Sequence, residues 1–215
     1  SMDDQQLTLT GIVERAERFH AGQAVISRRP SGAVSRTTFG ECASRARRLA
    51  GALRSLGVGP GDRVATLMWN QSEHLELYFA VPAMGAVIHT LNPRLFPDEL
   101  GYIVDDAGDT VIVVDESLLE VFDGLCVTAE FDHVIVVTHG GEHPAGTLNY
   151  ESLLADAEPV EWSAIDEHQP AAMCYTSGTT GRPKGVVYSH RALVLHSLVA
   201  ALPDQLAVSA RDTVL

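Results

Sequence analysis

The chain has 215 residues, 46% hydrophobic composition and a formal net charge of −13 at pH 7. This length can bury a substantial core as one domain or two small ones, and the acidic balance disfavours binding to nucleic acid or anionic lipid headgroups. Its three cysteines, Cys42, Cys126 and Cys174, are far apart and form no CxxC pair, so we expect reduced thiols in a cytoplasmic protein, without a disulfide framework or zinc knuckle.

The first six residues contain no basic region followed by an apolar run, so they do not resemble a signal peptide. No apolar stretch has the length that crossing a bilayer requires. We therefore expect neither a secretory leader nor a transmembrane segment.

The first predicted element is a helix that begins after Thr38. Apolar residues recur three or four positions apart from Phe39 to Leu56, which is the pattern of an amphipathic helix. Thr38 can cap the helix start, and Gly57 suits the left-handed residue that follows a helix end. Four arginines lie mostly off the apolar face and are interpreted as solvated helix surface: Arg45, Arg47, Arg48 and Arg54.

The next segments alternate between short apolar strands and helices. Strands are predicted at 64–69, 87–90, 110–114 and 134–137; helices are predicted from Asn70 or Ser72 to Pro82, from Pro97 to Gly108, and over 118–125; residues 138–147 read as a polar loop. Apolar strands that alternate with helices indicate a parallel sheet covered by helices on both faces. The predicted fold class is therefore α/β, with a parallel helix-covered sheet.

The segment with the clearest chemical character follows a short apolar strand at 171–175. The loop at 176–185 holds three glycines, four hydroxyl side chains and one lysine, and a short apolar piece at 186–188 leads to a helix capped by Ser189. Glycines let backbone N–H groups approach a ligand closely, and successive N–H groups form a concavity for anions. With the hydroxyls and Lys184, this loop has the groups needed to hold a polyphosphate.

The loop is not a Walker A motif. That motif has Gly, four residues and then Gly-Lys-Ser/Thr, whereas Pro183 stands five positions after Gly178 and Gly185 follows Lys184. A Ser/Thr/Gly-rich surface loop without a ligand is the alternative that composition alone leaves open.

Residues 175–185 resemble, position for position, the phosphate loop of the adenylate-forming superfamily, which includes acyl-CoA synthetases, luciferases and the adenylation domains of peptide synthetases. Residues 61–64 open a strand as they do in that superfamily. Residues 69–74, 84–95 and 187–191 are similar to its fatty-acid–CoA ligase branch. The similarity covers nearly the whole chain from about Phe39.

The resemblance implies a two-step reaction in which ATP adenylates a carboxylate and coenzyme A then displaces AMP. The expected substrates are a medium- or long-chain fatty acid, ATP and coenzyme A, with Mg²⁺ sharing the charge of the phosphates. It assigns Lys184 as catalytic and assigns nucleotide binding to Thr176, Ser177, Gly178, Thr179, Thr180, Gly181, Lys184 and Gly185. No metal-binding residue is assigned.

The superfamily places its adenine, ribose, magnesium and acyl contacts after this loop, and a small C-terminal domain supplies a further lysine. We therefore expect residues 1–215 to be an incomplete N-terminal domain, with the phosphate loop at 175–185 and the remainder absent. Such a fragment should be inactive alone, and its uncovered apolar surface should favour a homo-oligomer. The alternatives are a non-catalytic nucleotide-binding or interaction fragment, and an adenylating enzyme that delivers acyl groups to a carrier protein.

Other candidate sites have simpler interpretations. His139 and His143 lie four apart, but the glycines and proline around them exclude a shared helix, and His190 and His196 do not share a helical face. Cys174 is interpreted as a small core residue within its strand. The pair Asp105-Asp106 is interpreted as solvated helix surface.

Overall fold

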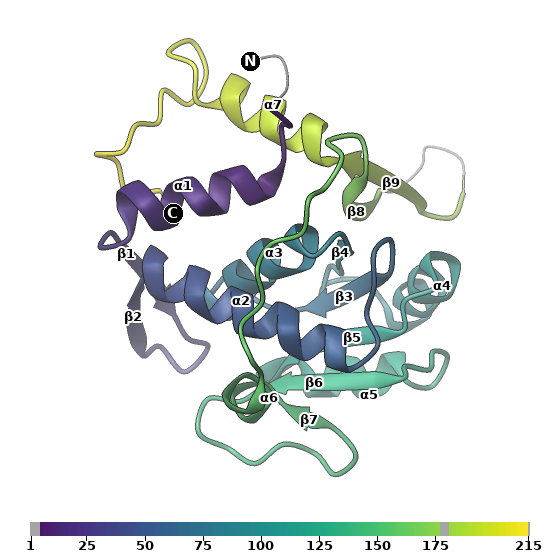
Figure 1. The fold of residues 1–215 in the computed structure, drawn as a ribbon. Helices are drawn as coiled ribbons and strands as arrows, with labels where there is room; N and C mark the ends of the chain where they lie inside the picture. The colour runs from purple at the N-terminus through teal and green to yellow at the C-terminus, as the bar shows by residue number, and fades with distance from the viewer. Residues whose placement is uncertain (1–4, 177–180, 215) are drawn as a thin grey trace.

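The computed structural model describes residues 5–176 and 181–214, and its main feature is a seven-stranded sheet (Figure 1). The strand order is β7-β6-β5-β3-β4-β8-β9, and neighbours are parallel except for the antiparallel pair β8–β9. The strands of this sheet are β3 (Arg63–Leu67), β4 (Val87–Thr90), β5 (Val111–Asp115), β6 (His133–Val137), β7 (Leu148–Asn149), β8 (Pro170–Thr176) and β9 (Lys184–Ser189).

A second, two-stranded sheet precedes it in the chain. Its strands β1 (Ala24–Arg28) and β2 (Val34–Thr38) form an antiparallel hairpin. The helices are α1 (Leu9–His20), α2 (Phe39–Ser55), α3 (Ser72–Ala83), α4 (Pro97–Ala107), α5 (Leu119–Leu125), α6 (Tyr150–Asp156) and α7 (His190–Ala200), and a 3₁₀ turn, η2 (Glu116–Leu118), leads into α5.

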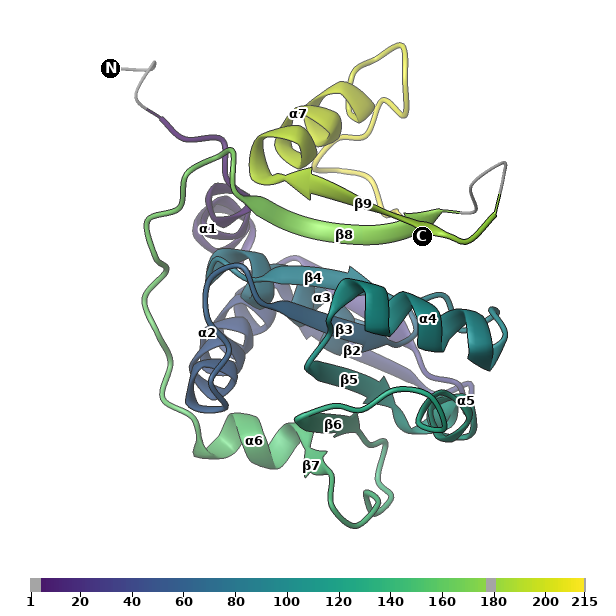
Figure 2. The same ribbon diagram turned by 90° about the vertical axis from the view of Figure 1, so that its right-hand side faces the viewer.

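Helices cover both faces of the sheet, as the apolar strands predict. Successive strand residues point to opposite faces, so Val64 packs with α2, α3 and α6, whereas Ala65 packs with α4 and α5. Figure 2 shows the strands β8, β4, β3, β5 and β6 in order, with α2 and α4 on opposite sides. The predicted α/β class with a mostly parallel, helix-covered sheet is confirmed.

Strands β4 and β5 are added to the sheet on opposite sides of β3. The chain moves from β3 to β4 through α3, then returns past β3 to β5 through α4. Such crossovers are right-handed. Because the two crossovers run in opposite directions across the sheet, α3 and α4 lie on opposite faces. The crevice beyond the carboxyl ends of the central strands is where open α/β sheets bind ligands.

Several predicted helix boundaries are confirmed. Thr38 and Glu41 form a capping box at the start of α2, and Gly57 follows its end with a φ of 92°. Gly108 ends α4 in the left-handed conformation, and the Ser189 hydroxyl accepts a hydrogen bond from the Ala192 amide at the start of α7.

The predicted cap of α3 is wrong. Gln71 occupies the N-cap position and makes no side-chain capping bond. The Ser72 amide instead donates to the hydroxyl of Ser27 on β1, at 2.8 Å. A contact from a distant strand therefore satisfies a helix-end N–H group that local sequence would leave to a cap.

Hydrogen bonds join the start of α1 to the segment before β8 and to the first residue of α7. The Leu7 amide donates to Glu167 at 2.8 Å, and the Leu9 amide donates to Nδ1 of the buried His190 at 3.2 Å. Burial lowers the pKa of His190, which keeps that nitrogen free to accept. In both views α1 lies beside α7 (Figures 1 and 2).

Candidate functional site

The β8–β9 hairpin forms the base of the predicted phosphate loop. Residues 170–176 run out along β8, and residues 184–189 return along β9. The antiparallel register pairs Tyr175 with Gly185 and Thr176 with Lys184. This pairing brings Thr176 and Lys184, which are eight positions apart in the sequence, to opposite sides of the loop's mouth.

The hairpin opens at the carboxyl edge of the parallel sheet. Strand β8 is parallel to β4, with Ile88 opposite Ala172, so its last residue, Thr176, lies toward the edge where β4 ends. Figure 2 shows β8 lying beside β4, with β9 on its other side. The loop is therefore placed where α/β folds bind ligands.

The described site residues are accessible from solvent. Thr176, Gly181, Lys184 and Gly185 are all exposed. Gly181 has a φ of 139°, a backbone conformation that side-chain-bearing residues rarely adopt, so a glycine is required there. Ser177, Gly178, Thr179 and Thr180 lie outside the described residues, and their assignment remains a prediction.

The loop is shorter than predicted. Thr176 belongs to β8, and Lys184 and Gly185 belong to β9, so the connection covers 177–183 rather than 176–185. Hydroxyl residues, lysine and glycine at these positions gave no strand signal, because backbone pairing with the partner strand, rather than local propensity, makes them extended.

A second polar cluster lies at the carboxyl edge, around Asp115 at the end of β5. Gln71 donates to Asp115 at 2.7 Å, Ser117 donates to it at 2.6 Å, and His139 Nε2 lies 2.8 Å from it. Burial alone would raise the pKa of Asp115, but these hydrogen bonds outweigh it and hold the pKa below its ordinary value. Sequence reasoning missed this cluster because its members come from three separate segments of the chain, the start of α3, the end of β5 with η2, and the residues after β6.

His139 and His143 have different hydrogen-bond partners in the structure. His139 bonds to Asp115, whereas His143 lies 3.0 Å from the Thr147 hydroxyl. Across residues 5–176 and 181–214, no group of three or more His, Cys, Asp or Glu side chains is arranged to hold a metal ion.

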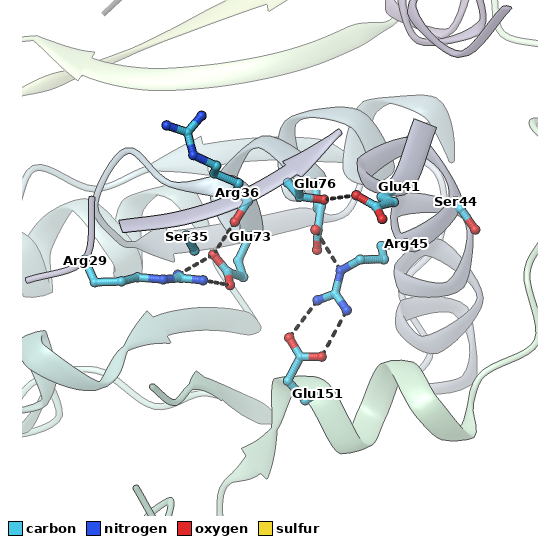
Figure 3. A pocket seen from close by; sticks show the side chains of 11 residues that line it. Arg29, Ser35, Arg36, Glu41, Ser44, Arg45, Glu73, Glu76 and Glu151 are labelled. Atoms are coloured by element: carbon cyan, nitrogen blue, oxygen red, sulfur yellow. Dashed lines mark hydrogen bonds and ion pairs between the residues drawn. The ribbon is translucent and has the colours of Figure 1, made fainter. Parts of the chain in front are cut away.

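A surface cavity of about 430 Å³ lies between β2, α2 and α3 (Figure 3). Arg29 forms a bidentate pair with Glu73, with the shorter contact at 2.6 Å. Arg45 bonds to Glu76 at 2.8 Å and to Glu151 at 2.7 Å. The wall holds three arginines and four glutamates, and carboxylates pair with the guanidinium groups of Arg29 and Arg45, so the cavity is unsuited to phosphate.

This cavity corrects one interpretation of the sequence. The expectation of solvated helix surface holds for Arg48 and Arg54, which are exposed. It is wrong for the half-buried Arg45, which links α2 to α3 and α6, and for Arg47, which bonds to Glu17 of α1 at 2.9 Å. Partners from distant elements cannot be seen in the helix periodicity.

The cysteines agree with the expectation of free thiols: Cys42, Cys126 and Cys174 are unpaired. Cys174 is only half-buried, with its sulfur 3.9 Å from the Tyr188 hydroxyl, so its interpretation as a core residue is only partly right. Within the described part of the chain, no helix combines the length and the apolar character that crossing a membrane would need.

Comparison with known proteins agrees with this geometry. The family model of the AMP-binding enzymes matches residues 12–215. A long-chain-fatty-acid–CoA ligase of Thermus thermophilus is 50% identical over 219 residues, which cover 100% of this chain and 39% of the relative. A medium-chain-fatty-acid–CoA ligase of Ectopseudomonas oleovorans is 42% identical over 98% of this chain and 40% of its own length.

Solved structures show the same fold. A long-chain-fatty-acid-CoA ligase of Archaeoglobus fulgidus superposes with a TM-score of 0.83 at 26% identity, covering 97% of this chain and 41% of that one. The chain spans about two fifths of the length of the relatives that it matches. From the family match and these likenesses, we conclude that the chain belongs to the AMP-binding enzyme family.

Proposed function

We propose that this chain forms the phosphate-binding part of an ATP-dependent acyl-CoA ligase. The observation that carries the proposal is the register of β8 and β9, which sets Thr176 and Lys184 opposite each other at the carboxyl edge of the sheet. The two relatives described above, at 50% and 42% identity, are named long-chain- and medium-chain-fatty-acid–CoA ligases, which supports a medium- or long-chain fatty acid as the substrate.

In the first proposed step, a carboxylate oxygen of the fatty acid attacks the α-phosphorus of ATP. The bond from that phosphorus to the bridging oxygen breaks, and pyrophosphate leaves with the negative charge. Lys184 and the backbone N–H groups of the loop stabilise that charge as it develops. In the second step, the thiol of coenzyme A attacks the acyl carbonyl, and AMP leaves as the thioester forms.

Mg²⁺ is proposed to arrive bound to the phosphates of ATP. The described residues contain no cluster of three or more acidic, histidine or cysteine side chains that could hold it. We therefore assign no residue of this part to the metal and route no step through it.

Lys184 offers a direct test, because it is the only lysine among the 215 residues. An amine-reactive reagent can therefore modify one side chain, together with the chain's N-terminus. We expect pyrophosphate and ATP to slow the modification of Lys184, measured by mass spectrometry of the peptides, while the N-terminus reacts at an unchanged rate. Equal rates with and without pyrophosphate would remove Lys184 from the phosphate site.

The matching kinetic test is the exchange of pyrophosphate into ATP by the full-length ligase. We expect Lys184→Ala to lower the exchange rate by roughly 10²–10³, the loss typical of one donor to a developing anion. Arg36→Ala removes an exposed cation on β2 and is the matched control, which should leave exchange unchanged. Release of AMP that requires a carrier protein rather than coenzyme A would favour the carrier-protein alternative.

A further inference from the structure

Helix α4 contacts the chain on both sides of the phosphate loop. Before the loop, the Tyr175 hydroxyl donates to Asp106 at 2.7 Å. After the loop, the Arg182 guanidinium carbon lies 4.8 Å from the centre of the Tyr102 ring. Because Tyr102 and Asp106 are four apart on α4, one helix face carries both contacts.

The Tyr175 ring is enclosed by two further groups. Its centre lies 5.4 Å from that of the His89 ring, with 40° between the ring planes. The ring also lies against Gly185, which is paired with Tyr175 in the β8–β9 register. A Cβ added to Gly185 would lie 3.1 Å from Tyr175 Cζ. A side chain at position 185 would therefore require the ring to shift by a few tenths of an ångström.

His89 is itself held in place by a contact with Asp109. It is completely buried on β4, and its Nδ1 lies 2.6 Å from Oδ2 of the buried Asp109, at the entrance to β5. The sheet therefore supports the Tyr175 ring from one side, while α4 holds its hydroxyl. Movement of the ring would disturb contacts in β4, β9 and α4 together.

The bond from Tyr175 to Asp106 is of the stronger, charge-assisted kind. Burial raises the pKa of Tyr175 well above its ordinary value, and the Asp106 carboxylate raises it further. The hydroxyl therefore remains a donor throughout the neutral range. Asp105 and Asp106 are both exposed, so their interpretation as solvated surface is confirmed, but Asp106 also accepts a hydrogen bond from a residue 69 positions further along the chain, which no local pattern predicts.

We propose that Tyr102 and Asp106 of α4 are positioning residues for the reaction. They hold the two stems of the phosphate loop, through Arg182 and Tyr175, at a fixed separation. A loop whose stems are already placed loses less conformational freedom when phosphates bind, so affinity for ATP and pyrophosphate rises. This inference rests on the proposed function of the loop and assigns residues outside the loop to it.

The test uses pyrophosphate exchange by the full-length ligase, with unmodified enzyme measured first. Asp106→Asn and Tyr175→Phe each weaken or remove one bond to a charged group, which corresponds to about a tenfold rise in the KM for ATP and pyrophosphate. The KM for the fatty acid and the melting temperature should stay near those of the unmodified enzyme. Asp105→Asn, which changes the neighbouring exposed carboxylate, is the matched control.

Two further comparisons separate positioning from folding. The double variant Tyr175→Phe/Asp106→Asn should be no weaker than the worse single variant, since both changes act on the same bond. Tyr102→Leu should raise the KM for ATP, whereas Tyr102→Phe keeps the ring under Arg182 and should restore it. In the 215-residue chain, Tyr102→Leu should also weaken the protection of Lys184 by pyrophosphate.

Each result decides the matter. If the unmodified enzyme does not exchange pyrophosphate, the proposed function is wrong, and the positioning role that rests on it is wrong as well. If the unmodified enzyme exchanges but Asp106→Asn behaves like Asp105→Asn, only the positioning role fails. It also fails if the variants lower the melting temperature and weaken all substrates equally, because that pattern indicates a purely structural contact.

Discussion

At the residue scale, Glu76 is a carboxyl group on whose pKa burial and hydrogen bonding act in opposite directions. It is 1% exposed on α3, and it accepts hydrogen bonds from Arg45 Nε and from the Tyr150 hydroxyl, each at 2.8 Å. Burial nevertheless raises the pKa of Glu76 to about 7, against the lowering effect of both donors. Glu76 should therefore make the free energy of unfolding depend on pH, and it is assigned no role in the reaction.

We expect the stability of this chain to fall as Glu76 ionises. Because its folded pKa is above that of a free glutamate, its contribution is fully present below about pH 4.5 and is lost as pH rises through about 7. Relative to Glu76→Gln, the free energy of unfolding should decrease on the order of 3 kcal/mol from pH 4.5 to pH 8. Urea titrations of both proteins across this range measure the difference.

Glu151→Gln supplies the control for this prediction. Glu151 binds the same guanidinium group of Arg45 but is 54% exposed, so its pair should matter little to stability. The difference between the unmodified chain and Glu151→Gln should stay flat across the same pH range. A flat difference for Glu76→Gln as well would show that the buried carboxyl does not titrate there.

At the element scale, the central part of the fold follows from local signals. The strands β3 to β6 are short, mostly apolar segments, and α2 and α4 have apolar periodicity with glycines at their ends, so these strands and helices could be predicted. The elements α1, β1, β2, α6 and β7 were not predicted. Helix α1 has 12 residues and the apolar spacing of an amphipathic helix, so it could have been predicted. The other four are short or half-exposed, and pairing with distant segments rather than local pattern stabilises them.

The candidate site divides in the same way. Glycine, hydroxyl and lysine residues gather within one stretch of the sequence, so the loop could be found without a structure. Tyr102, Asp106 and His89 are contributed by α4 and β4, more than 60 positions earlier, and no spacing rule links them to the loop. Side chains that support a site from another element become visible only in the folded chain.

A close approach at Gly51 shows the same dependence on distant segments. The connection from α6 to β8 crosses α2 (Figure 1), and the Val160 amide donates to the Arg47 carbonyl at 3.2 Å. A Cβ built on Gly51 would collide with the carbonyl oxygen of Glu158. Glycine is therefore required by packing at this position, although its backbone is ordinary helix.

We expect Gly51→Ala to destabilise the chain although alanine is the better helix former. The clash with backbone should cost about 1–3 kcal/mol, which exceeds the gain in helix propensity of about 1 kcal/mol. Gly11→Ala in α1 is the matched control, because nothing lies within 4 Å of its added Cβ. Chemical denaturation should show opposite signs for the two variants, and a stabilised Gly51→Ala would mean that the connection does not press on α2.

At the scale of the whole molecule, apolar side chains are exposed along α7 and the segment after it. Leu198 is 58% exposed, Leu202 is 52% exposed and Leu206 is 72% exposed. Such a grouping is unusual for the free surface of a soluble domain. It agrees with a chain that aligns with about two fifths of its relatives' length, and self-association of the 215 residues remains a prediction.

The last prediction concerns catalysis by these 215 residues alone: we expect no turnover. The described residues supply the pyrophosphate side of the proposed reaction, through the β8–β9 hairpin, and no described group is assigned to the fatty acid, the ribose or coenzyme A. Catalysis needs every group that holds the reacting atoms, and held geometry is worth up to ~7–11 kcal/mol. Loss of that positioning would slow the reaction by several orders of magnitude.

Release of AMP, with medium- and long-chain fatty acids and coenzyme A supplied together, is the measurement. Protection of Lys184 by pyrophosphate, measured on the same sample, shows whether the loop is intact. Protected Lys184 without AMP release is the expected pair of results, since phosphate contacts survive where the positioning of the carboxylate does not. AMP release at the rate of a complete ligase would mean that the hairpin and its supporting helix α4 suffice for chemistry, and the division of labour proposed for this fold would then be wrong.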